Sequence, residues 1–122
     1  MLEVTVYRDG DRLAGLSASG HTEFAAHGED IVCAAVSAIL QAVRLGLAEH
    51  ARAEVVARQE PGMLELSWAE DRRDDESVRA IVATAELAIE QIAVKYPDHV
   101  RLRRIDVRPS SRGTRAPRTG NT

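Results

Sequence analysis

The chain has 122 residues, of which 44% are hydrophobic and 29% charged, and its formal net charge is −3. These values are typical of one globular domain. We see no apolar run long enough to cross a bilayer and no basic, apolar leader, so we expect a cytoplasmic protein with no membrane partner. The single cysteine excludes an internal disulfide, and a 3% share of aromatic residues disfavours nucleic-acid binding through stacked aromatic side chains.

The charges are unevenly distributed along the chain. Residues 108–122 include four arginines and no acidic residue, which leaves 12 basic and 19 acidic residues over 1–107. We therefore expect a single acidic domain over 1–107, which suits a cationic partner. The segment 108–122 consists mostly of Pro, Ser, Gly, Thr and Arg, so we expect a disordered, solubilising tail, with a weak RNA contact as the alternative.

The N-terminal part of the chain predicts a hairpin. Apolar and polar residues alternate over 2–7, and a second strand follows over 13–19. Asp9-Gly10 is a strong hairpin signal, and we expect Asp11 and Arg12 to lengthen the turn.

A long helix follows, and then a second set of elements. From residue 31 to about residue 51 the chain is apolar on nearly all sides, which indicates a helix buried on more than one side or a subunit interface. We then expect two strands, over 53–58 and 62–69. A second helix should follow, capped by Asp74 and Asp75, with Glu86 and Glu90 facing solvent and its end near Pro97. The last expected element is a bulged strand over 100–107.

The predicted order is β-β-α-β-β-α-β. Two long helices with apolar faces need a sheet to cover. We therefore predict an α+β fold, a two-layer domain with a mostly antiparallel sheet and both helices packed on it.

The residues with the clearest chemical potential lie between Gly20 and Ser37. We expect Asp30 to cap the long helix, which would place Cys33 in the first turn, where unpaired amides and the helix dipole favour a thiolate. His21 lies twelve positions upstream, at the end of the second strand. A histidine that reaches the sulfur would make this pair a candidate for nucleophilic catalysis.

Three further residues accompany this pair. Ser37 shares a helix face with Cys33 because it lies four positions later. Gly20 and Gly28 bracket the intervening loop, which suits a segment that closes over a substrate.

The residues alone leave other roles open. A single cysteine in an apolar helix is more often an inert core residue, and His21 by itself is typical of an ordinary loop histidine. His21, His27 and Cys33 are also conceivable zinc ligands, but three ligands on one loop are a weak metal signal. We therefore predict no metal and no cofactor.

The motif nevertheless resembles a known family. Gly20-His21, eleven further residues and then Cys33, within the sequence GxDIVCAAxS over 28–37, is similar to the bacterial ribosomal-processing cysteine protease family, Prp. The resemblance extends from the opening strand to residue 107 and does not cover the arginine-rich tail. Thr22 stands where many members have alanine, directly after the histidine and not in its place.

This resemblance implies a cytoplasmic, homodimeric cysteine endopeptidase. Members remove a short N-terminal extension from a large-subunit ribosomal protein, the twenty-seventh of the L series, after a hydrophobic, Phe-containing stretch. Cys33 would be the nucleophile and His21 the general base, with Asp30 and Ser37 supporting the site. The rival hypotheses are a non-catalytic, ribosome-associated assembly factor that uses the tail on RNA, and a redox-sensing thiol, which lacks a resolving cysteine.

Overall fold

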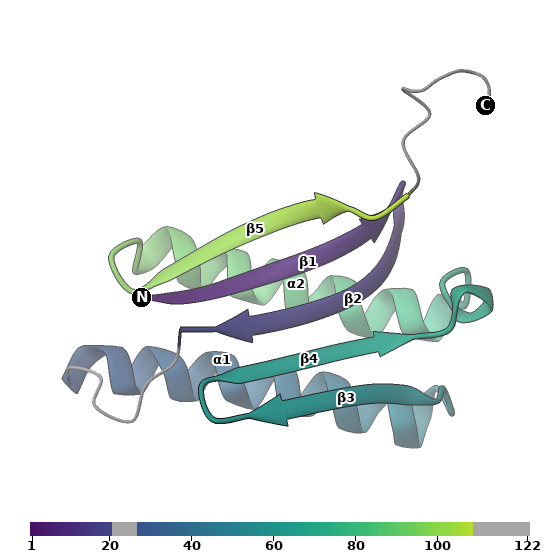
Figure 1. The fold of residues 1–122 in the computed structure, drawn as a ribbon, viewed down its shortest axis with the longest axis horizontal. Helices are drawn as coiled ribbons and strands as arrows, with labels where there is room; N and C mark the ends of the chain where they lie inside the picture. Colours follow the sequence, from purple (N-terminus) through teal and green to yellow (C-terminus); the bar gives the residue numbers. More distant parts are fainter. Residues whose placement is uncertain (21–26, 109–122) are drawn as a thin grey trace.

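The computed structural model describes residues 1–20 and 27–108, and it describes side chains over 1–20 and 31–108. Figure 1 shows the arrangement of the elements. In chain order these are β1 (Leu2–Asp9), β2 (Arg12–Ser19), α1 (His27–Leu45), the π-helical turn η1 (Gly46–His50), β3 (Val55–Glu60), β4 (Met63–Trp68), the 3-10 turn η2 (Glu70–Arg72), α2 (Glu76–Lys95) and β5 (Val100–Asp106).

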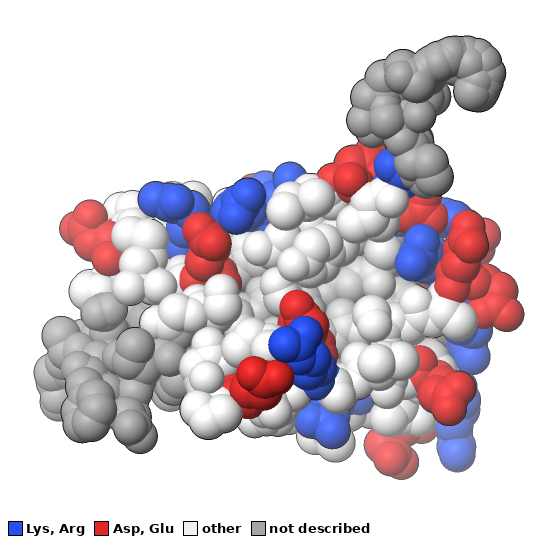
Figure 2. Space-filling view, viewed as in Figure 1, with Lys and Arg blue, Asp and Glu red and all other residues white. Residues whose placement is uncertain are grey.

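The five strands form one sheet in the order β3-β4-β2-β1-β5. Only the pairing of β1 with β5 is parallel, because β5 returns to the sheet after α2. Both helices lie behind the sheet in Figure 1, and Figure 2 shows the opposite face, where broad uncharged areas separate clusters of both signs. The predicted two-layer α+β fold and its element order are therefore confirmed.

The core lies between the sheet and the two helices. Val4 and Val6 of β1 are completely buried, as the alternation of apolar and polar residues predicts. Gly46, at the start of η1, lies against α2. A Cβ added there would lie at an ordinary contact distance of 3.4 Å from Cδ1 of Ile81, so this position does not require glycine.

The hairpin differs from the predicted one in two details. Its turn contains only two residues, because Arg12 already belongs to β2 and pairs with Asp9. Gly10 takes the first turn position with φ 68, a conformation that favours glycine. The register then shifts, with Tyr7 opposite Gly15 and Arg8 opposite Leu13, so the bulge lies in β2.

The expected bulge in the last strand was wrong. β5 pairs with β1 without interruption from Val100 to Asp106. Its apolar residues lose their alternation because Arg104 occupies a position facing the helices, where its Nε lies 2.6 Å from Glu86 of α2. The predicted solvent-facing position of Glu86 was also wrong: this residue is 5% exposed and also accepts a hydrogen bond of 2.7 Å from Arg8.

The predicted N-cap is confirmed for α2 and wrong for α1. Asp75 caps α2 as expected, since its side chain accepts a hydrogen bond of 2.9 Å from the amide of Ser77. α1 begins at His27, so Asp30 is the fourth residue of the helix and is not its N-cap. Acidic residues are favourable at the N-cap and throughout the first turn of a helix. Glu29 and Asp30 therefore indicate that a helix begins nearby, but not at which residue it begins.

The expectation about long apolar runs also needs correction. The stretch Ile31–His50 is long and apolar enough to cross a membrane by length and composition, with a mean hydropathy of 2.0. Core helices pass the same test, and here Val36, Leu40 and Leu47 are buried in the core. About 33% of the most apolar part of the stretch is buried inside the molecule.

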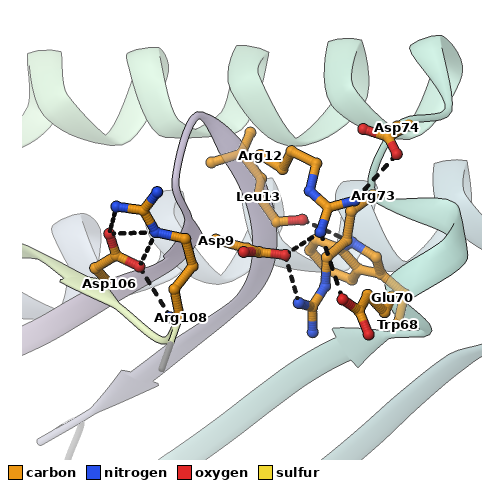
Figure 3. Close-up of polar contacts among 9 residues, drawn as sticks. All are labelled: Asp9, Arg12, Leu13, Trp68, Glu70, Arg73, Asp74, Asp106 and Arg108. Atoms are coloured by element: carbon orange, nitrogen blue, oxygen red, sulfur yellow. Dashed lines mark hydrogen bonds and ion pairs between the residues drawn. The ribbon is translucent and has the colours of Figure 1, made fainter. Parts of the chain in front are cut away.

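An ion-pair cluster holds the β1–β2 hairpin against the segment before α2, as Figure 3 shows. Asp9 accepts hydrogen bonds from Arg12 and, at 3.0 Å, from Nη1 of Arg73. Arg12 also donates to Asp74 at 3.0 Å, so Asp74 is an ion-pair partner, and Asp75 alone caps α2. The hydrogen bond from Arg73, together with that from Arg12, holds the pKa of Asp9 below its ordinary value of 3.8.

We predict that Asp9→Asn lowers stability at neutral pH and flattens its acid dependence. A carboxyl group with a depressed pKa stabilises the fold above its unfolded pKa, and this contribution is lost as the pH falls through the folded pKa. The difference in unfolding free energy between wild type and variant should therefore shrink below about pH 4. Urea titrations across this range measure it, with Asp98→Asn, an exposed loop aspartate, as the control. Parallel curves for wild type and Asp9→Asn would contradict the prediction.

Candidate functional site

The elements that carry the candidate site meet at one end of the sheet. The end of β2, the β3–β4 turn and the N-terminal half of α1 lie together on the left of Figure 1, opposite the ion-pair cluster of the hairpin. Gly20 follows β2 directly, and Cys33 and Ser37 lie on α1. The strand order produces this meeting, since β2 and β4 are neighbours and α1 packs behind them.

Gly20 is required by the backbone geometry. Its φ is 90, in the region that favours glycine, and a Cβ added there would lie 2.4 Å from the carbonyl oxygen of Met1. The chain therefore leaves β2 in a direction that no other residue type takes without strain.

Cys33 lies deeper in the helix than the sequence predicted. It is the seventh residue of α1, in the second turn, because the helix begins at His27. The residue is 4% exposed and belongs to the core together with Val32 and Val36. The unpaired amides of the first turn are thus about one turn away, and the helix dipole decays over that distance, so a reactive thiol at this position depends more on a neighbouring base.

The remaining predicted residues fall into two groups. Ser37 is exposed one turn after Cys33. Gly28 lies inside α1, so it does not end the loop as expected. His21 lies outside the described residues, as do the side chains of His27 and Asp30, and the relation of His21 to Cys33 stays a prediction.

A groove of about 440 Å³ opens beside Ser37. On one side it is lined by Ser37 and Gln41 of α1, and on the other by residues 59–64 around the β3–β4 turn. Its floor contains Leu2, Ala18, Val36 and Leu40, all of which are buried. Sequence reasoning missed Gln41, although its position eight residues after Cys33 places it on the same inclined row of the helix.

Cys33 does not line this groove, but it precedes Ser37 by one helical turn, so a chain molecule bound along the groove would lie near the thiol. Among the residues for which side chains are described, no three His, Cys, Asp or Glu side chains gather to hold a metal. The zinc alternative depends on His21 and His27, which lie outside that search.

Comparison with known proteins shows the family and the fold of the chain. A family model described as "Cysteine protease Prp" matches residues 1–101. The structure of SMU.848 from Streptococcus mutans superimposes with a TM-score of 0.81 at 24% identity, over 87% of this chain and 98% of that one. An essential ribosomal processing protease Prp from S. aureus in complex with a substrate peptide gives 0.77 at 19% identity, over 85% and 99%. No curated protein matches the chain in sequence.

We predict that Gly20→Ala destabilises the fold by about 2 kcal/mol or more, because a Cβ meets the backbone of Met1 and φ is positive. Gly46→Ala is the matched control: its Cβ would touch only the side chain of Ile81, and alanine favours a helix. Urea unfolding of both variants measures the difference. Equal stability of the two variants would show that the turn at Gly20 tolerates a side chain.

Proposed function

The chain belongs to the cysteine protease Prp family, and we propose that it removes the N-terminal extension of a large-subunit ribosomal protein, the twenty-seventh of the L series, with Cys33 as nucleophile and His21 as general base. One observation carries the assignment of the nucleophile. A cysteine protease needs a thiol, and Cys33 is the only cysteine in the chain. Ser37, one turn after Cys33 on α1, lines a groove that could take a peptide.

In the proposed reaction, the imidazole of His21 accepts the proton of the thiol, and the sulfur attacks the carbonyl carbon of the scissile peptide bond. The C–N bond then breaks, and the protonated imidazole returns the proton to the leaving amine. A water molecule gives a proton to His21 and attacks the thioester, and the C–S bond breaks. The cleaved N-terminal extension leaves as an acid, and the proton returns from His21 to the sulfur of Cys33. Because Cys33 is only 4% exposed, its neighbours must move before a peptide carbonyl reaches the sulfur.

The substrate assignment is supported by two independent features. The S. aureus relative is a ribosomal processing protease that was solved with a substrate peptide and with a covalently linked product peptide. The chain over 1–107 is acidic, and ribosomal proteins are typically basic, so charge favours their encounter. A ribosomal substrate would also place the protein in the cytoplasm.

The protease domain would span residues 1–107. Asp30 and Ser37 would support the site, although the catalytic role of each is open. The arginine-rich segment 109–122 lies outside the described residues, and its weak contact with RNA stays a prediction from the sequence. No observation favours the non-catalytic assembly factor over a protease.

We predict that Cys33→Ala abolishes cleavage of a peptide spanning the extension and its junction. His21→Ala should lower kcat by about 10²- to 10⁴-fold, the usual contribution of a general base. Mass spectrometry of the products measures both effects, and circular dichroism checks the fold. His99→Ala, which changes a histidine in the α2–β5 connection, is the matched control and should retain activity. Full cleavage by Cys33→Ala would refute the assignment.

We also propose that the protein is a homodimer that buries the outer side of the two helices. An apolar groove of about 480 Å³ lies between α1 and α2, lined by Ile39, Ala42, Ile81 and neighbouring residues. Large apolar side chains are also exposed on these helices, among them Leu45 at 63% and Leu87 at 62%. Patches of this kind usually mark interfaces.

The dimer proposal predicts that Ala42→Glu, which puts a charge into this groove, yields a monomer. Val56→Glu is the control, since Val56 is 64% exposed on the opposite face of the sheet. Size-exclusion chromatography with light scattering distinguishes the two states. A wild-type monomer, or a dimer that only Val56→Glu dissociates, would contradict this interface.

A further inference from the structure

We propose that the outer edge of β5 is a docking site for an extended segment of a partner protein in which apolar and acidic residues alternate. β5 is the last strand in the order β3-β4-β2-β1-β5, so within the described part of the chain one of its edges has no neighbouring strand. Addition of a strand to such an edge is a common way to bind an extended peptide. The edge shares no lining residue with the groove beside Ser37, and the inference does not depend on protease activity.

The backbone of β5 presents hydrogen-bonding groups along this edge. The carbonyl of His99 and the amide of Val107 both bond to β1, at 2.9 and 2.7 Å. Backbone groups of successive strand residues point to opposite edges, so the odd-numbered residues of β5 face β1 and the even-numbered ones face outward. The amides and carbonyls of Leu102 and Arg104 are therefore in position to pair with an added strand.

An apolar groove of about 370 Å³ lies between β5 and α2. Leu102 and Arg104 point to this side of the sheet, because they pair with the buried Val4 and Val6 of β1. Arg104 is already bonded to Glu90 at 3.1 Å, so the charges of these two lining residues are satisfied. Every second side chain of an added strand would enter the groove, where an apolar residue would be desolvated. The apolar lining consists of Met1, Ala93, Val94, Pro97, Val100 and Leu102.

The opposite face of the same edge is basic. Arg101 and Arg103 lie on the open face of the sheet, with side chains 62% and 50% exposed. Both pair with the same carboxylate, that of Glu3, at 3.5 and 3.4 Å, so the group keeps a net positive charge. Figure 2 shows basic side chains along the upper edge of the molecule, where Figure 1 places β5. The remaining side chains of an added strand would lie beside these arginines, where acidic residues are favoured.

Charge also decides between an acidic partner and a second copy of this chain. Two β5 strands paired edge to edge would bring arginines together, and like charges on paired strands repel. An acidic strand replaces this repulsion with attraction, so the arginines select the partner. The surrounding sequence agrees, since residues 95–108 include five basic and two acidic residues, whereas 1–94 include eight and 17.

The test uses a labelled peptide of alternating valine and glutamate, seven residues long like β5, and fluorescence anisotropy on the full chain. Arg103→Glu should raise Kd about three- to tenfold, because a like charge then faces the peptide. Val94→Asp, at a position that is 73% exposed, should raise Kd by about as much because it puts a charge into the groove. Arg58→Glu is the matched control, since Arg58 is 61% exposed on β3 at the opposite edge of the sheet. Binding that both β5-edge variants leave unchanged would overturn the proposal.

Two further ligands separate strand addition from attraction by charge alone. A peptide with a methyl group on every backbone amide keeps all side chains and charges but cannot donate hydrogen bonds to the carbonyls of β5, so its Kd should rise about tenfold or more. A peptide with the same residues in two blocks loses the alternation and should also bind more weakly. Equal affinity for the methylated peptide would overturn strand addition. An RNA oligonucleotide that binds as tightly as the alternating peptide, with the same dependence on Arg103, would show a general polyanion surface and would likewise overturn it.

Discussion

The packing of one row of α1 against the sheet is the constraint on which the rest of the structure depends. Val36, Leu40 and Val43 are between 1% and 3% exposed, and they fix both the position and the rotation of the helix. Because the rotation is fixed, Cys33 faces the core and Ser37 faces the groove. The same helix therefore holds Cys33 on its buried side and lines the groove with Ser37 and Gln41.

The two ends of the sheet serve different purposes. At the hairpin end, Asp9 gathers Arg12 and Arg73, and Trp68 donates a hydrogen bond of 2.9 Å to the carbonyl of Leu13. At the other end, the groove beside α1 presents polar groups with no partner in the described part of the chain. At the hairpin end most polar groups bind one another, apart from the buried Nε of Arg73, whereas the polar groups that line the groove are available to a ligand. A protease needs both, because one end of the sheet must hold the fold together while the other binds a peptide.

Ion pairs also form part of the contact between α2 and the strands β1 and β5. Glu86 of α2 is 5% exposed and binds Arg8 of β1 and Arg104 of β5. These bonds join the parallel strands β1 and β5 to α2, the helix that precedes β5 in the chain, and the bond to Glu86 raises the pKa of Arg104 above its ordinary value. The buried carboxylate of Glu86 needs both guanidinium partners. It therefore favours this one arrangement of β1, β5 and α2, in addition to holding them together.

The sequence alone determined the element order, the hairpin at Gly10, the cap at Asp75 and the α+β class, because these follow from local periodicity and turn chemistry. It also singled out Cys33 through a motif. Only the tertiary structure decided that α1 begins at His27, that Glu86 is buried, and that Gln41 and the β3–β4 turn share a groove with Ser37. Each of these depends on which segments distant in the chain become neighbours, and a pattern of period two or 3.6 carries no information about that choice.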